Sequence, residues 1–489
     1  MEDDSKDLEQ QLLLKEEEPA GPPPPPLPPL TRRDAAGEAR RRQPPSPSGS
    51  TSPTAPAIPR GSPPAGCSTW GGVSNLVVSA VGAGMLALPR ALAETGVLAG
   101  CLLFIFVCVL TFFSASIIVR HATALGTQSY GELVRANFGG ASALLLQLSI
   151  VTHVFGVMVV YLIIIQDMLV GSVPHYRGVL PELLHRHDAP WWLTRPAVAG
   201  ALLAAVVCPL LVPRSLTAVA RCSRLSVLTI GLLAATICGL AAAAVAQGKA
   251  AAVHFLPPGL GAAAAGGGVL ALIRSSVTVL AVACLAMTVH FVLCPVQASL
   301  GEQDCRSMLR VLRLANSLCT AIYAVVAISG YLLFGDATEG DVLKNLTVRF
   351  ASGLVPHRVA VVVINGVVLA YTFNLLCNFV WAVRENVCEA ALGKTDRLLG
   401  PATFYGITAG LVLLAYALSV WIPSIYSLIA IVGATACVTF SYLFPGLLVF
   451  KERGAGLGRR VTAGGMLALG VCMAAVETLN HVAGGGGGG

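Results

Sequence analysis

The sequence predicts an all-α polytopic membrane protein with eleven transmembrane helices. Of its 489 residues, 55% are hydrophobic and 12% are charged, about half the charged share of a soluble globular domain, which is roughly 25%. From residue 70 onward, apolar runs of roughly 20 residues follow one another. A helix of this length spans about 30 Å of hydrocarbon, the core of a membrane. These two observations exclude an ordinary soluble enzyme.

The apolar runs are separated by short polar breaks. Their ranges are 70–92, 97–119, 141–166, 197–212, 225–246, 269–293, 311–334, 357–382, 402–422, 424–450 and 461–483. The fourth run is short and contains Pro209, but Trp191 and Trp192 directly before it fit an aromatic belt at the membrane interface. We therefore expect it to span as well.

Residues 1–66 differ from the rest of the chain. They hold 16 of the 30 prolines, including the run Pro22–Pro26, and such a segment buries too little apolar surface to offset the entropy of ordering. We expect a disordered cytosolic tail, because no signal-peptide pattern is present. Its proline run is either a solvated linker or a ligand for an SH3 or WW domain. The helical domain then covers 67–484, and 485–489 form a glycine tail.

The orientation follows from the short loops, because Lys and Arg resist translocation. Fifteen of them fall in loops on the N-terminal side of the membrane and eight in the opposite loops. This bias predicts a cytosolic N-terminus and places Gly489 on the other side. The sequon Asn345-Leu346-Thr347 then lies in a non-cytosolic loop, where Asn345 would be glycosylated, although chance sequons are frequent.

Several other classes of partner have no support in the sequence. The net charge of +7 is mild and forms no basic stripe, so we expect no nucleic acid partner. Pairs of cysteines at CxxC spacing and Cys/His clusters are missing, so we expect no metal and no cofactor.

The N-terminal tail contains one candidate address. Glu9, Leu13 and Leu14 fit an acidic dileucine sorting motif, which adaptor proteins read for delivery to lysosomes or vacuoles. Such an address is read by a receptor and anchors nothing. The alternative is a short apolar patch in a disordered tail.

The first apolar run contains a candidate break. Gly82, Gly84 and Pro89 interrupt what would be a straight helix, and a broken helix is tolerated in hydrocarbon only where its freed backbone groups line a cavity or are buried in protein. The N–H groups that begin the second half suit a carboxylate, and the freed carbonyls suit an ammonium or a cation. We expect the glycines to let the backbone open around a zwitterion held by Ser79, Gly82, Ala83, Gly84 and Met85. The alternative is a small-residue packing face between two helices.

The sixth run carries a second candidate break. It places Thr288 and His290 shortly before Pro295. Ionisable groups in a membrane span usually face the interior of the bundle, so His290 is a candidate for the binding site. A neutral histidine bonded to a backbone carbonyl is the alternative.

Further polar residues lie inside the predicted spans. His153 lies in the third span, and Asn374 and Asn378 lie one turn apart in the eighth. Each of these could line the cavity, Asn374 as a substrate ligand, or bond across helices. Glu94 and Asp167 mark helix ends, where a carboxylate can reach water. Because no acid falls within the two breaks, a cationic ligand would lack its counter-charge, which favours a neutral zwitterion.

Five segments resemble the signatures of the amino acid/auxin permease superfamily. They are Val81–Pro89, Val160–Asp167, His290 followed by Pro295, Gly330–Gly335 and Phe444–Gly446. The match runs from about residue 70 to 455 and is most similar to the sodium-coupled neutral amino acid transporters and the plant vacuolar amino acid transporters.

The resemblance implies a five-plus-five inverted repeat of the leucine-transporter kind, with the substrate held at the breaks of helices 1 and 6. It implies a secondary active transporter of small neutral amino acids in the vacuolar, lysosomal or plasma membrane, and no enzyme. A sensor that binds an amino acid and signals through the 66-residue tail is the alternative.

One departure from the family concerns the coupling ion. Sodium-coupled members have Asn where this chain has Val78, and Leu375 stands where a Thr is expected. Sodium needs oxygen ligands, so we expect coupling to protons, or to no ion, with sodium symport as the alternative. His290 is the candidate coupling residue, because histidine titrates near neutral pH.

Overall fold

The computed structural model of the chain describes residues 67–171, 178–184, 190–207, 216–258, 260, 268–301, 304–378, 387–388, 400–422 and 424–485. The expected tail at 1–66, with the motif Glu9, Leu13 and Leu14, lies outside the described residues. So do residues 486–489 of the expected glycine tail.

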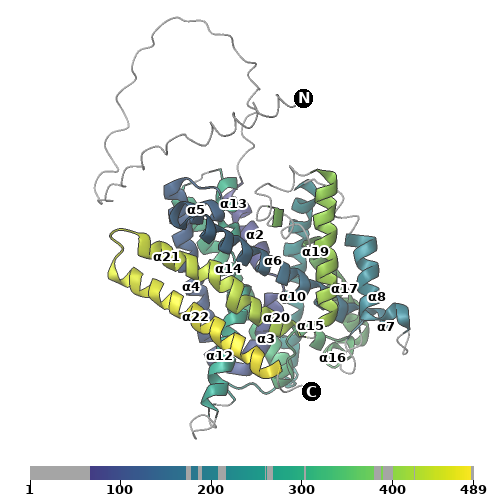
Figure 1. Ribbon diagram of the computed structural model, residues 1–489. Coiled ribbons are helices and arrows are strands. Elements are labelled where there is room, and N and C mark those ends of the chain that lie inside the picture. Colours follow the sequence, from purple (N-terminus) through teal and green to yellow (C-terminus); the bar gives the residue numbers. More distant parts are fainter. Residues whose placement is uncertain are drawn as a thin grey trace, which may run out of the picture. The chain divides into compact units, whose positions relative to one another are not determined.

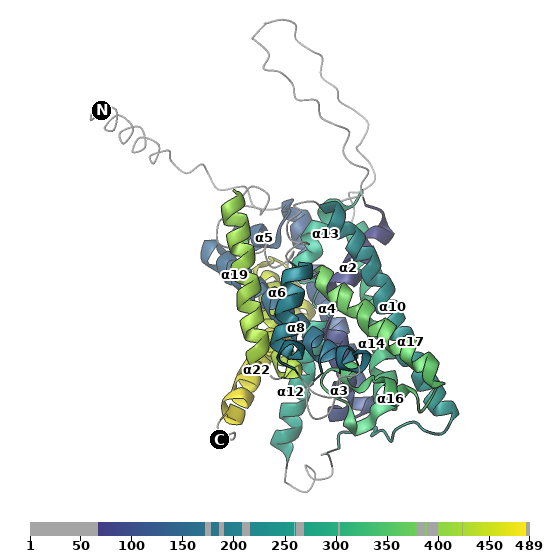
Figure 2. The same ribbon diagram turned by 90° about the vertical axis from the view of Figure 1, so that its right-hand side faces the viewer.

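Within the described part, every regular element is a helix (Figures 1 and 2). The helices that matter below are α2 (Thr69–Ala80), α3 (Gly84–Thr95), α4 (Val97–Leu125), α5 (Tyr130–Phe138), α6 (Gly140–Leu169), α7 (Val179–Leu183), α8 (Arg195–Leu202), α10 (Leu216–Ala246), α12 (Val269–Ala286), α13 (Leu293–Ser299), α14 (Cys305–Phe334), α15 (Val342–Asn345), α16 (Val348–Ala351), α17 (His357–Asn378), α19 (Pro401–Trp421), α20 (Ile425–Val432), α21 (Phe444–Lys451) and α22 (Leu457–Gly485).

Among the described residues, eight helices are long and apolar enough to cross a membrane, and the bent pair α2 and α3 raises this number to nine if it counts as one span. Two shorter apolar helices lie at Arg195–Ala205 and His357–Thr372. The segments that would complete the expected spans 197–212 and 357–382 fall partly outside the described residues.

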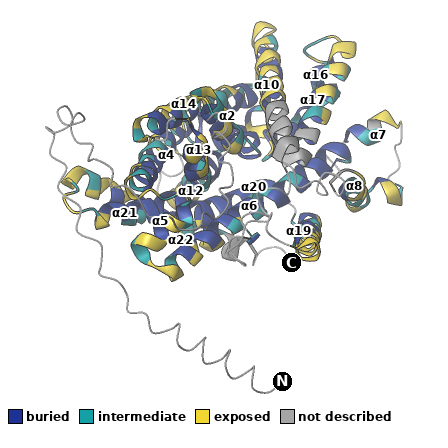
Figure 3. Ribbon diagram, turned by 90° about the horizontal axis from the view of Figure 1, so that it is seen from above, coloured by how far each residue is buried: buried dark blue, intermediate teal, exposed yellow. Residues whose placement is uncertain are grey.

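The surface of the bundle is apolar, as expected for helices that face lipid. Large side chains such as Val109 and Leu413 are 63% and 66% exposed, which costs little free energy in a bilayer because lipid tails are as apolar as leucine. Seen from above, buried residues gather on α6, α12 and α20, while α10, α16 and α19 carry many exposed ones (Figure 3). The site therefore has to be sought between the buried helices.

The chain turns sharply between α2 and α3. The two helices are bent by 60°, and Val81, Gly82 and Ala83 separate them. At the other end of α3, Gly96 adopts φ +75° and lets α4 begin at once. Both α2 and α3 pack against α14, where a Cβ on Gly330 would lie 2.7 Å from Pro89 Cγ.

A second interruption follows α12. That helix ends at Ala286, and a 3-10 turn at His290–Val292, η3, precedes α13. Two π-helical stretches, η6 (Gly433–Cys437) and η7 (Thr439–Leu443), link α20 to α21. Such π segments widen a helix locally and are frequent at functional sites. Here they pack against α12, α6 and η3.

Candidate functional site

The two interruptions lie directly against each other. A Cβ added to Gly84 would lie 2.7 Å from Ala286 Cα, a distance that real Cβ atoms do not show. Gly84 therefore serves the close approach of the start of α3 to the end of α12. Neither Gly82 nor Gly84 has a positive φ in this conformation, and the expectation that they let the backbone open around a substrate stays a prediction. At Gly82, too, space is short, since a Cβ would lie 2.7 Å from Tyr161 Oη.

A tyrosine hydroxyl joins the two interruptions. Tyr323 on α14 is fully buried, and its Oη lies 2.7 Å from the carbonyl oxygens of both Ala80 and Ala286. These carbonyls end α2 and α12, where the helix dipole adds negative partial charge. One O–H therefore serves two acceptors. Sequence reasoning missed Tyr323, because a tyrosine inside an apolar helix carries no signal of its own.

His290 lies buried beside the second interruption. Its Nε2 lies 2.7 Å from Ser114 Oγ on α4, and its side chain is 1% exposed. The partner is a serine side chain, not the backbone carbonyl of the alternative interpretation. Its Nδ1 has no hydrogen-bond partner among the described residues, and a buried polar atom without a partner requires an explanation. Sequence reasoning missed Ser114, which lies 176 residues away.

An aromatic group surrounds the two buried histidines. The ring of Phe440, on η7, lies 6.5 Å from that of His290 and 5.4 Å from that of His153. Phe291 completes this group, at 6.2 Å from Phe440. His153 is paired differently from His290, since its Nδ1 lies 3.1 Å from Cys437 Sγ. The structure thus brings His153 to the site from α6.

The other expected ligands lie around this centre with mixed exposure. Ala83 and Met85 are buried, and Thr288 Oγ1 donates to the Cys284 carbonyl at 2.6 Å. Ser79 is exposed and donates to the carbonyl of Asn75 one turn earlier.

Two predictions of the eighth span fall outside what can be described. Asn374 and Asn378 belong to α17, but their side chains are not among the described ones. In the glycosylation sequon, Asn345 is the last residue of α15; its Oδ1 accepts from Glu339 N, and its Nδ2 donates to the Ala337 carbonyl.

A small gap lies beside the two interruptions. The gap beside Ala80, Met287 and Val289 has a volume of about 10 Å³, which is close to the least that holds one water, about 10–15 Å³. This gap is too small for an amino acid.

The expectation that Asp167 reaches water is wrong. Its side chain is fully buried and forms ion pairs with Arg195 at 2.6 Å and Lys344 at 2.8 Å. These cations come from α8 and α15, so the carboxylate ties three elements together. Burying a carboxylate without such partners would cost several kcal/mol. Glu94, by contrast, is partly exposed and binds Arg90 and Tyr426.

Comparison of the sequence with known proteins identifies a family and related transporters. Residues 65–463 match the family model described as "Transmembrane amino acid transporter protein". The chain is 28% identical to amino acid transporter AVT6E of Arabidopsis thaliana over 430 residues, 85% of this chain and 83% of that protein. It is 26% identical to sodium-coupled neutral amino acid transporter 7 of Xenopus laevis over 417 residues, 82% of this chain and 84% of that protein.

A solved structure supports the fold. The crystal structure of MhsT in complex with L-phenylalanine matches with a TM-score of 0.51 at 11% identity, over 84% of this chain and 97% of that chain. That likeness shows the fold alone, whereas the family model covers most of the sequence. The chain therefore belongs to the transmembrane amino acid transporter family, the amino acid/auxin permease family.

Proposed function

We propose that this protein is a proton-coupled secondary transporter of small neutral amino acids. Its eleven spans would be the eight apolar helices of the described residues, the pair α2 and α3 as one broken span, and the two shorter apolar helices. Helices α12 and α13 form the second broken span. The observation that carries the proposal is the meeting of both breaks at Tyr323, next to a buried histidine.

The breaks suit a zwitterion without a charged side chain. The N-terminus of α3 and the C-termini of α2 and α12 offer backbone groups of opposite polarity for a carboxylate and an ammonium. Residues 80–85 and 286–292 contain no acid, and Asp167 is engaged by two cations. A cationic amino acid would therefore lack a counter-charge. The neutral class also agrees with the name of the Xenopus relative.

The coupling proton would bind at His290. Ser114 has one hydroxyl proton, and its Oγ also lies 3.1 Å from the Thr111 carbonyl, to which it donates. Ser114 therefore accepts from Nε2–H of His290, and Nδ1 is left with a lone pair and no partner among the described residues. That lone pair is the place where a proton would be added, because neutral imidazole has one N–H and one acceptor nitrogen.

Sodium would find few ligands at these breaks. Val78 and Leu375 supply no side-chain oxygen, which leaves backbone carbonyls such as those of Ala80 and Ala286, each of which already accepts from the Tyr323 hydroxyl. A hard cation needs about six oxygen ligands to replace its hydration shell. The proposed transporter is therefore independent of sodium.

Proteoliposomes test this function. We expect saturable uptake of a radiolabelled neutral amino acid in sodium-free choline medium, driven by an imposed pH gradient and abolished by a protonophore. Arginine should not compete. His290→Ala should remove the pH dependence of uptake while substrate binding remains measurable. His153→Ala is the matched control, because it removes a buried histidine beside the same Phe440 ring and should leave the pH dependence intact.

Two results would contradict the proposal. Uptake that stops in choline and returns when sodium is added at constant pH would show sodium coupling. Saturable binding without flux would point to a receptor in place of a transporter.

We also propose delivery to a vacuolar or lysosomal membrane by the motif Glu9, Leu13 and Leu14. A fluorescently tagged chain with Leu13→Ala and Leu14→Ala should shift from that membrane to the cell surface. An unchanged distribution would remove the motif from the explanation.

A further inference from the structure

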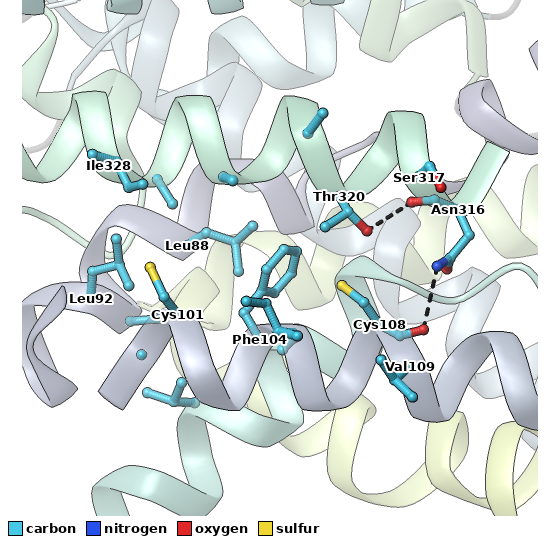
Figure 4. A pocket seen from close by; sticks show the side chains of 18 of the residues that line it. Leu88, Leu92, Cys101, Phe104, Cys108, Val109, Asn316, Ser317, Thr320 and Ile328 are labelled. Atoms are coloured by element: carbon cyan, nitrogen blue, oxygen red, sulfur yellow. Dashed lines mark hydrogen bonds between the residues drawn. The ribbon is translucent and has the colours of Figure 1, made fainter. Parts of the chain in front are cut away.

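A long groove lies on the outer side of the bundle between α4 and α14 (Figure 4). Its volume is about 590 Å³, within the range of sites that hold organic ligands, roughly 300–1,000 Å³. Leu88 of α3 and Ala283 of α12 are buried and form its floor, while Ile105 and Val109 at its rim are 53% and 63% exposed. In a bilayer the groove therefore opens to the acyl chains of lipid.

The groove is apolar along most of its length and polar at one end. Leu92 and Ile328 lie at one end of the view, Leu88 and Phe104 lie between, and Asn316 and Ser317 lie at the other end (Figure 4). Asn316 donates to the Cys108 carbonyl across the groove. Arg313 also lines the groove and precedes Asn316 by three residues on α14, about one helical turn. It is exposed, with no ion pair in the described part of the chain.

The dimensions place this arginine near the edge of the hydrocarbon. As an α-helix of 30 residues, α14 is about 45 Å long, which exceeds the roughly 30 Å of the hydrocarbon core. Arg313 lies about 12 Å from its N-terminus. The guanidinium can therefore reach the headgroup layer while the groove runs about 22 Å inward from Arg313 to Ile328.

We propose that this groove binds an anionic glycerophospholipid of the leaflet at the N-terminus of α14. One acyl chain lies between α4 and α14 over Leu88 and Ala283, and the phosphate accepts hydrogen bonds from Arg313 and Ser317. A zwitterionic lipid such as phosphatidylcholine also has a phosphate, but its choline cation offsets that charge, so a lipid with a net negative head is favoured beside Arg313. Charge complementarity at one end and an apolar floor along the rest select an amphiphile with an anionic head.

Photocrosslinking in nanodiscs tests this binding on the full chain. The membrane is phosphatidylcholine with a trace of phosphatidylglycerol that carries a diazirine on one acyl chain, and adducts are mapped by mass spectrometry. We expect adducts on residues 100–109 and 320–328. Unlabelled phosphatidylglycerol should compete about fivefold better than phosphatidylcholine, as expected for one arginine near an anionic headgroup. Adducts on the lipid-facing Leu413 of α19 should show no such preference.

Matched variants test the contact of the lipid headgroup and the contact of its acyl chain separately. Arg313→Gln should remove the preference for phosphatidylglycerol, whereas Arg310→Gln, on an exposed residue of the same helix outside the groove, should keep it. Ala324→Phe should fill the groove and suppress adducts there. Val325→Phe adds the same ring on the 45% exposed neighbouring position, which does not line the groove, and should leave the adducts.

The competition experiment needs no variant, so the proposal can fail even if a variant does not fold. Equal competition by the two lipids in the wild-type chain would overturn it, leaving a groove filled by bulk lipid. Retained preference in Arg313→Gln would overturn the assignment of the headgroup. Undiminished adducts in a folded Ala324→Phe protein would overturn the assignment of the acyl chain.

Discussion

At the scale of single residues, Gly84 controls how closely the two helix breaks approach. Gly84→Ala should abolish uptake and lower thermal stability, because the new Cβ would meet the backbone of Ala286; overpacking of this kind typically costs about 1–3 kcal/mol. The measurement is uptake in proteoliposomes together with thermal unfolding in detergent. Gly410→Ala on α19 is the control, since nothing lies within 4 Å of its added Cβ. Normal uptake by Gly84→Ala would show that the breaks do not have to touch.

Tyr323 is the second residue whose role is specific to this arrangement. Tyr323→Phe should lower both thermal stability and uptake, because two buried carbonyls lose their shared donor and an unsatisfied buried acceptor costs about 1–3 kcal/mol. Thermal unfolding and initial uptake rates measure the effect. Tyr416→Phe also removes a hydroxyl that donates to a carbonyl, but that hydrogen bond is exposed to solvent, so the variant should behave like wild type. Equal behaviour of the two variants would remove Tyr323 from the site.

At the scale of elements, the connection from α14 to α17 is closed around a buried acid. Asp341 caps α15 by accepting from Leu343 N at 2.9 Å, and its other oxygen has no partner among the described residues. Burial raises the pKa of Asp341 to about 7, and the carboxylates of Asp167 and Glu339 add to the shift while Lys344 opposes it. In the packed connection, the Asp341 carboxyl therefore keeps its proton up to about pH 7. In an opened and solvated connection it would lose that proton near pH 4.

The raised pKa of Asp341 determines how the stability of the packed connection changes with pH. Because the pKa is raised in the packed form, protonation stabilises that form fully below about pH 4, and the stabilisation is lost as the pH rises through 7. Hydrogen exchange of residues 341–351 should be slower at about pH 5.5 than at about pH 8 after correction for intrinsic rates. Asp341→Asn should make protection independent of pH. Protection that increases with pH in the wild type would contradict this account.

At the scale of the whole molecule, the orientation in the membrane decides on which side Asn345 lies. If the N-terminus is cytosolic, Asn345 lies on the other side, and enzymatic deglycosylation should shift the mobility of the wild type but not of Asn345→Gln. Thr347→Ser keeps the sequon and a hydroxyl that can cap α16, so it should still be modified. A tag at Gly489 that is accessible from the cytosol would contradict the topology expected from the charge bias of the loops.

The sequence was sufficient to predict several of the long helices and the place of one sharp bend. Apolar runs such as 97–119 and 402–422 correspond to α4 and α19, because spanning hydrocarbon demands length and hydrophobicity in one continuous stretch. The segment with Gly82 and Gly84 coincides with the 60° bend, since small residues are what a close approach of backbones requires. These are local properties, which the order of residues states directly.

The tertiary structure alone decided which side chains meet. Ser114 lies 176 residues from His290, Tyr323 lies 243 residues from Ala80, and Asp167 gains its two cations from α8 and α15. Ser114 and Tyr323 carry no signal of their own along the chain, and Asp167 even suggested a solvated helix end. Their partners depend on which helices pack together, and in a membrane protein that pairing is set by shape and by the need to satisfy buried polar groups, neither of which apolar periodicity encodes.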